Sequence, residues 1–156
     1  DDARGQISAA VPANWAGQFR DAGWDPATIG LPAGSAPGLL IGPDLAAWAD
    51  PTSTVPGLFA GVSRELRPGG PVPALPDHRA CTPHPQRRLD TVQGSARVLR
   101  FTGCGGSSVS FSEVLMMPHG ADFGVYVQIK QVGDTDRTDE LLGHLRLSKG
   151  SAPPGA

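Results

Sequence analysis

The residues with the most metal-like spacing lie in one short run, which holds Asp77, His78, Cys81 and His84. A thiolate and two imidazoles are ligands that Zn²⁺ prefers, and Asp77 could serve as a ligand or as an outer partner. Structural zinc sites usually combine close ligand pairs from two segments, whereas the second segment here offers only Cys104. We therefore expect that Cys81, His78 and His84 lie in a polar loop without binding a metal, and that the protein has no cofactor.

Cys81 and Cys104 are the two cysteines of the chain and enclose 24 residues, counting both ends. Their neighbours, Thr82-Pro83 and Gly105-Gly106, are typical of turns near the surface, whereas buried free cysteines prefer apolar elements. The pair predicts a disulfide, and hence an oxidising, extracytoplasmic setting. Two free thiols are the alternative.

Nucleophilic or paired-acid chemistry finds little support in the sequence. Ser107, Ser108, Ser110 and Ser112 cluster near glycine-rich turns, but no Gly-x-Ser-x-Gly motif surrounds them. Ser110 and Ser112 are predicted to lie on the solvent face of a strand. Glu113 has no obvious carboxylate partner, so the sequence does not support glycosidase chemistry.

The remaining histidines and glycines have structural explanations. His119 and His144 are expected in a turn and at a helix end, where an exposed imidazole is common. Gly103-Cys104-Gly105-Gly106 lacks the Lys-Ser/Thr that completes a phosphate-binding loop, so a hairpin turn is predicted. A small secreted hydrolase or metal-dependent enzyme that uses His78, His84 or His119 remains the catalytic alternative.

Loops on a rigid sheet usually carry recognition, so we look for ligand contacts there. Residues 67–88 contain six prolines and little periodicity, which predicts a long exposed loop tethered by Cys81. Residues 12–36 are also irregular. The predicted contact residues in and around these segments are Trp24, Trp48, His78, Arg79 and Tyr126, although each aromatic taken singly also fits core packing.

Size and charge restrict the function classes. The 156 residues and 16.1 kDa amount to one domain. A net charge of -2 argues against a nucleic-acid partner, which normally faces a strongly basic surface. No run approaches the roughly 18 consecutive apolar residues that a membrane-spanning helix needs. The 21 glycines and 16 prolines predict many turns and few long helices.

Apolar patterns place the elements. A strand over 6–11, one turn of helix within 13–20 and a helix over 45–50 capped by Asp44 are expected in the N-terminal half. The C-terminal half predicts an antiparallel meander followed by a helix over 137–146, whose leucine stripe would be buried on the sheet. The fold class is therefore α+β: an antiparallel β-sheet covered by a C-terminal helix. The predicted strands of the core are 38–42, 58–64, 97–102, 109–117 and 125–130.

The domain organisation predicted from these patterns has three parts. Residues 1–5 are expected to be a disordered N-terminal segment, 6–148 a single α+β domain, and 149–156 a flexible linker-like tail. This arrangement is typical of a domain cut from a longer protein, and the linker suggests a tether to a membrane protein.

The following segments together carry a resemblance: Leu39-Leu40-Ile41-Gly42-Pro43-Asp44-Leu45, Pro56-Gly57-Leu58-Phe59-Ala60-Gly61-Val62-Ser63, Cys81…Gly103-Cys104, Tyr126-Val127-Gln128-Ile129-Lys130-Gln131 and Asp136-Arg137-Thr138-Asp139-Glu140-Leu141-Leu142. They resemble actinobacterial extracytoplasmic domains, which accompany membrane-anchored proteins, including serine/threonine kinases, and secreted or lipid-anchored proteins. The resemblance covers about residues 6–147 and implies a PsbP-like sandwich that acts as a binding or sensing module without enzymatic residues. It transfers no ligand.

Together these observations predict a non-catalytic extracytoplasmic binding or sensor module that recognises a small ligand, an envelope component or a protein partner. The enzyme described above is the first alternative, and a structural assembly domain is the second.

Overall fold

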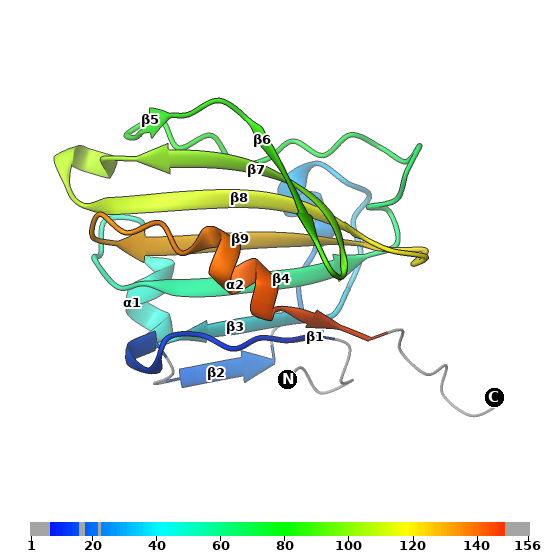
Figure 1. Cartoon of the computed structure of the whole chain (residues 1–156), viewed down its shortest axis with the longest axis horizontal. Coiled ribbons are helices and arrows are strands. Elements are labelled where there is room, and N and C mark those ends of the chain that lie inside the picture. Colours follow the sequence, from blue (N-terminus) through cyan, green and yellow to red (C-terminus); the bar gives the residue numbers. More distant parts are fainter. Residues whose placement is uncertain (1–6, 16–17, 22, 149–156) are drawn as a thin grey trace.

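An eight-stranded antiparallel sheet dominates the computed structural model, which describes residues 7–15, 18–21 and 23–148 (Figure 1). The predicted disordered start and linker tail lie outside the described residues. The strands follow one another across the sheet in the order β2 (Gln18–Asp21), β3 (Gly38–Gly42), β4 (Gly57–Ser63), β9 (Gly124–Val132), β8 (Val109–Pro118), β7 (Gly94–Thr102) and β5 (Thr82–Pro83), with β6 (Arg87–Thr91) also pairing with β7.

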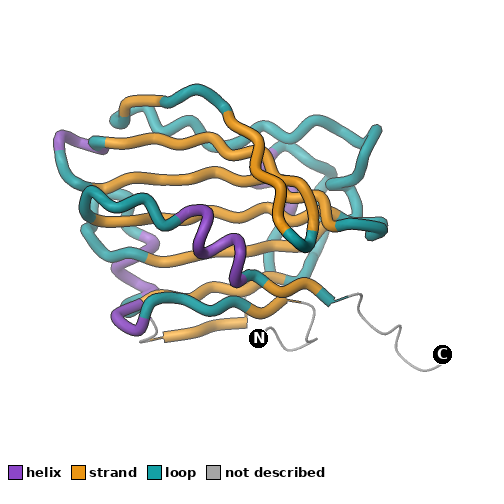
Figure 2. Tube along the Cα trace, viewed as in Figure 1, coloured by secondary structure: helices purple, strands orange, loops and turns teal. Residues whose placement is uncertain are grey.

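The helices are few and short (Figure 2). They are α1 (Leu45–Ala49), α2 (Thr138–His144) and the 3₁₀ turns η1 (Ala13–Trp15), η2 (Pro26–Ile29) and η3 (Cys104–Gly106). A second, two-stranded sheet pairs β1 (Ile7–Ser8) with β10 (Arg146–Leu147). The predicted antiparallel α+β architecture is confirmed, and so is the meander of β7, β8 and β9.

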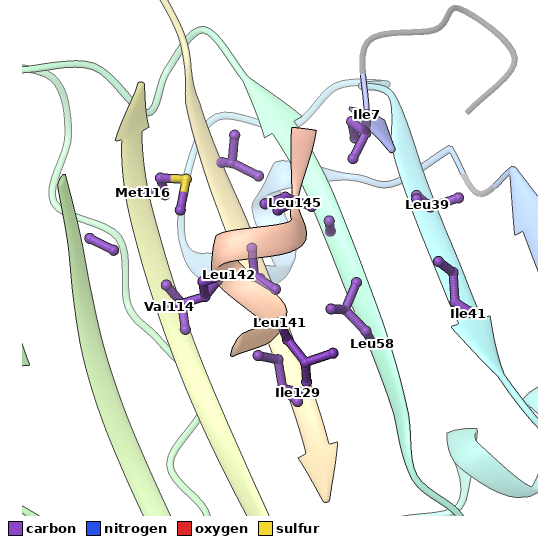
Figure 3. Packing of buried hydrophobic residues seen from close by; sticks show 14 of the residues in the cluster. Ile7, Leu39, Ile41, Leu58, Val114, Met116, Ile129, Leu141, Leu142 and Leu145 are labelled. Atoms are coloured by element: carbon purple, nitrogen blue, oxygen red, sulfur yellow. The ribbon is translucent and has the colours of Figure 1, made fainter. Parts of the chain in front are cut away.

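One face of the large sheet, here called the helix face, is mainly apolar and packs against α2. Because side chains alternate along a strand, Val114 and Met116 of β8 share this face with Ile129 of β9. Figure 3 shows Leu141, Leu142 and Leu145 from α2 and its end directed towards these strands. Each fully buried leucine contributes roughly 2 kcal/mol to the free energy of unfolding, so these leucines hold α2 firmly against the sheet.

The opposite face, here called the loop face, is covered by irregular chain. Trp24, Ile29 and Leu31 pack there against Leu115 and Tyr126. A smaller cluster at the end of β7 and β8 contains Phe101, Cys104, Val109 and Phe111. Both faces of the central strands are therefore buried, and any polar side chain on them needs a partner within the protein.

The prediction that Ser110 and Ser112 lie on the solvent face is wrong. The register of β8 places both on the helix face, and they are 3% and 0% exposed. The Ser112 hydroxyl forms a hydrogen bond of 2.7 Å with the Thr138 hydroxyl at the start of α2. Ser112 thus joins the sheet to the start of α2.

The main strands differ by at most three residues at their ends from the predicted bounds, and three other elements differ more in length or type. The strand over 6–11 is reduced to Ile7–Ser8, and the turn within 13–20 is η1 followed by strand β2. The helix over 137–146 ends at His144, because the next residues pair with β1. The cap of α1 is confirmed: the Asp44 carboxylate accepts a 3.0 Å hydrogen bond from the Ala47 N–H.

Two glycines in β4 allow two tryptophans to lie directly on the loop face. A Cβ atom at Gly61 would stand 2.5 Å from the Trp24 ring, and one at Gly57 would stand 2.4 Å from the Trp48 ring. The Trp24 indole N–H also donates to the Val62 carbonyl at 3.1 Å. Glycine is needed at both positions because an indole occupies the space of a side chain.

We predict that Gly61→Ala lowers the free energy of unfolding by about 1–3 kcal/mol, because the added methyl group displaces the buried Trp24 ring. Gly143→Ala in α2 is the control. A Cβ atom at Gly143 would meet nothing within 4 Å, so alanine there should stabilise the helix by about 0.5–1 kcal/mol. Urea denaturation measures both values. Equal stabilities for the Gly61 variant and the wild type would contradict the packing argument.

Candidate ligand-binding site

A row of polar side chains runs across the loop face at the centre of the sheet. Glu113 of β8 stands opposite Gln128 of β9 in the strand register, and Tyr126 and Lys130 flank Gln128 on the same face. Glu113 and Lys130 are 0% exposed. Charged side chains are rarely buried without hydrogen-bond or ion-pair partners, so the partners of Glu113 and Lys130 show which segments these two residues hold in place.

The Glu113 carboxylate receives three side-chain hydrogen bonds. The Tyr126 hydroxyl donates to Oε2 at 2.6 Å, and the Gln128 amide donates to Oε1 at 2.8 Å. The third partner is His78, whose Nε2 lies 2.6 Å from Oε1. An ionised carboxylate can only accept hydrogen bonds, so the donors Tyr126 and Gln128 suit an ionised Glu113.

His78 joins the long loop to the sheet. Besides its bond to Glu113, its imidazole stacks on Phe111 with a centroid distance of 4.1 Å and an interplanar angle of 13°. The Phe101 ring lies 4.9 Å away on the next strand. A hydrogen bond at one ring edge and a stacking contact on the ring face leave the imidazole little rotational freedom.

The predicted disulfide between Cys81 and Cys104 is present, with an S–S distance of 2.03 Å. It links the loop to the β7–β8 hairpin, three residues after His78. Two backbone bonds reinforce it: Cys81 N–H donates to the His78 carbonyl at 2.9 Å, and Gly105 N–H donates to the Ala80 carbonyl at 2.8 Å. The disulfide and the His78–Glu113 bond therefore hold the same segment of the loop on the sheet.

A cavity of about 570 Å³ opens beside these contacts. Its volume lies within the range of roughly 300–1,000 Å³ that is usual for small-molecule sites. We call it the disulfide pocket. Its walls are mainly apolar, and its lining residues are Pro51, Thr52, Asp77, His78, Arg79, Ala80, Cys81, Cys104, Gly105, Ser107, Val109 and Phe111.

Lys130 holds the turn that contributes Pro51 and Thr52 to the lining of the disulfide pocket. Its ammonium group donates to the Asp50 carbonyl at 2.8 Å and to the Ser53 hydroxyl at 2.9 Å, and so fixes the turn that contains Pro51 and Thr52. Burial lowers the pKa of Lys130 below its ordinary value, and the nearby Asp50 carboxylate opposes this shift.

The predicted contact residues fall into three environments. His78 lines the disulfide pocket, and Arg79 lies on its rim, where its exposed guanidinium is 3.5 Å from the Asp77 carboxylate. Trp48 is half-buried over Gly57, outside the disulfide pocket. Trp24 and Tyr126 are core residues, 8% and 5% exposed, so burial removes them from the surface that a ligand reaches. Tyr126 still acts on the pocket indirectly, through Glu113.

The metal-ligand interpretation of the loop does not fit the structure. Cys81 is in the disulfide and has no thiolate to offer, while the His84 ring bonds to the Thr102 hydroxyl at 2.7 Å. His119 is at the end of β8, where its backbone N–H donates to the Gln93 carbonyl. Within the described ranges, no group of three or more His, Cys, Asp or Glu residues is placed to hold a metal ion.

Sequence reasoning missed Glu113, Gln128 and Phe111. The available signal was Glu113 itself, a charged residue at an inward position between Phe111 and Leu115 in an apolar strand. Its partners could not be found from the sequence, because His78 approaches from 35 residues away along an irregular loop.

A second cavity of about 560 Å³ lies at the other end of the sheet, between segments 32–37, 62–65 and 122–123. Its charged residues include Arg64 and Asp122, an exposed pair 3.7 Å apart. Among the described residues the buried charged side chains are Glu113 and Lys130, and both bond to segments that line the disulfide pocket, which is therefore the stronger candidate site.

Comparisons of this chain with family models, with curated proteins and with solved structures gave no match. In the part of the chain that the structure describes, no helix has the length and apolar character needed to cross a membrane.

The contact between Tyr126 and Glu113 predicts that the free energy of unfolding falls at alkaline pH. Burial raises the pKa of the Tyr126 hydroxyl above its ordinary value of 10.0, and the neighbouring Glu113 carboxylate raises it further. Above pH 10 the unfolded chain loses this proton while the folded chain keeps it. The free energy of unfolding should then fall by about 1.4 kcal/mol per pH unit, and below pH 10 this contribution should be constant.

Tyr126 is the single tyrosine of the chain, so tyrosinate absorbance in the near ultraviolet reports on this residue alone. We expect ionisation only when the protein unfolds. Tyr126→Phe should lack this component of the pH dependence in urea titrations. Ionisation of the folded protein close to pH 10 would contradict the burial and the carboxylate contact.

Proposed function

We propose that this protein is a non-catalytic extracytoplasmic binding or sensor module, and that the disulfide pocket is its ligand site. The observation that carries the proposal is the fixed position of His78. Its ring is held by Glu113 at one edge and by Phe111 on one face, on the wall of a largely apolar cavity. Apolar cavities with a few oriented polar groups are the usual form of small-molecule sites.

The disulfide supports the extracytoplasmic part of the proposal, because such bonds persist in oxidising compartments. The antiparallel sheet with α2 on one face supports the PsbP-like sandwich that the sequence resemblance implies, with α2 as its cover. In this proposal the ligand is a small molecule, a part of the envelope or a segment of a protein partner that inserts into the pocket.

The experiment is a ¹H–¹⁵N NMR titration of the whole chain with benzyl alcohol, benzoate and benzylamine. We expect at least one of the three probes to shift the signals of residues 77–81 and 104–111. Ala80→Trp should abolish these shifts, because Ala80 lines the disulfide pocket and the larger side chain would fill it.

Ala27→Trp is the matched control: Ala27 is exposed on η2 and does not line the disulfide pocket, so probe binding should be retained. The proposal fails if none of the probes shifts these residues, or if the Ala80 variant binds them as well as the wild type does.

A second candidate function is supported by the pairing of His78 with a buried carboxylate. A carboxylate that orients an imidazole is the arrangement used in general-base catalysis. A hydrolase also needs free hydrogen-bond donors that stabilise the oxyanion of the transition state. Two backbone donors near His78 are already used, because Gly105 N–H bonds to the Ala80 carbonyl and Gly106 N–H to the Gly103 carbonyl.

Hydrolysis of p-nitrophenyl acetate distinguishes the two functions. A binding module should show no more hydrolysis with wild-type protein than with His78→Gln. Saturable hydrolysis that His78→Gln reduces by about a hundredfold or more, the lower range of general-base contributions, would favour the enzyme.

A further inference from the structure

The hydrogen bond between His78 and Glu113 determines what the disulfide pocket can offer a ligand. When Glu113 accepts from His78 as it does from Tyr126 and Gln128, the proton of the His78–Glu113 bond lies on His78 Nε2. In the neutral imidazole this tautomer has no proton on Nδ1, which then acts as a hydrogen-bond acceptor.

The Nδ1 atom is accessible and has no partner. Among the described residues, the hydrogen bonds of the His78 side chain involve Nε2 alone. Three buried side-chain atoms in the described part of the chain lack a partner, Trp48 Nε1, Arg100 Nε and Ser110 Oγ, and His78 Nδ1 is not among them. Since His78 lines the disulfide pocket, the pocket presents one oriented acceptor from its wall.

The surroundings of this acceptor favour an aromatic ligand without charge. Phe111, Val109 and the disulfide sulfurs line the same cavity, and sulfur makes favourable contacts with aromatic rings. The rim charges of Asp77 and Arg79 pair with each other. An anion would meet the Glu113 carboxylate behind the His78 ring, and a cation would have to leave water for mainly apolar walls.

We propose that the disulfide pocket binds a small neutral aromatic molecule that donates a hydrogen bond from a hydroxyl or N–H group to His78 Nδ1. This inference rests on the proposed function and narrows it to a ligand class. It excludes carboxylates, phosphates and amines as the preferred ligands of the site.

Phenol and anisole test the proposal, because they share a ring and differ in whether the oxygen carries a proton. Dissociation constants are measured by ¹H–¹⁵N NMR titration of the whole chain at neutral pH. We expect both probes to shift residues 77–81 and 104–111, with phenol binding roughly two- to tenfold more tightly, the effect of one hydrogen bond.

His78→Gln isolates the acceptor from the rest of the site. A glutamine amide can reach Glu113 much as Nε2–H does, but it places no acceptor at Nδ1. In this variant the preference for phenol over anisole should disappear, while binding of anisole is retained. His84→Gln is the control, since His84 does not line the disulfide pocket and the preference should be unchanged.

The outcomes separate this inference from the proposed function. Equal binding of phenol and anisole at the pocket by the wild type overturns the hydrogen-bond inference and leaves the ligand site in place. Tighter binding of anisole than of phenol would likewise overturn the hydrogen-bond inference and leave the ligand site in place. A preference for phenol that persists in His78→Gln places the acceptor elsewhere and also overturns the inference. If neither probe shifts the pocket residues, both proposals fail.

The His78→Gln result requires a variant that still folds. Its fold is checked by the NMR signals of the helix face, around Val114, Ile129 and Leu142, which should match those of the wild type. If they do not, the comparison of benzyl alcohol with benzyl methyl ether on the wild-type protein decides: only a preference for the alcohol supports the inference.

Discussion

The structure on the loop face depends on one requirement, that a carboxylate at the centre of a fully covered sheet must be satisfied. Glu113 has no exposed surface, and an uncompensated charge there would cost several kcal/mol. Two of its donors, Tyr126 and Gln128, come from the neighbouring strand, and the third comes from the loop through His78. The same bond therefore satisfies the charge, places the loop and orients the imidazole on the pocket wall.

The two faces of the sheet differ in the interactions that they make with the rest of the chain. On the helix face, apolar side chains of β8 and β9 pack with α2 in the largest cluster of buried hydrophobic residues. This frees the loop face to carry Glu113, Gln128 and Lys130, each of which holds a covering segment or another polar group in place. The pocket lies where two such segments, 50–53 and 77–81, approach the disulfide.

The strands of the meander and the cap of α1 could be predicted, because alternation and capping are local patterns. The disulfide followed from the turn-like surroundings of Cys81 and Cys104. The burial of Ser112 could not be predicted. An alternation of polar and apolar residues is the same whether water or a helix with a hydroxyl partner covers the polar side chains. The His78–Glu113 pair was also hidden, because the 67–88 segment has no periodicity from which its path can be read.

The contact between Gly61 and Trp24 has a consequence for the history of this chain. A side chain at 61 and an indole at 24 compete for the same space, so a larger residue at 61 is disfavoured as long as Trp24 is present. Ancestral or divergent sequences with the same architecture should change the two sites together, with a larger residue in the strand accompanied by a smaller one in the wrapping segment. Such paired replacement would be a covariation signature that identifies remote kin even where the pocket residues have been lost.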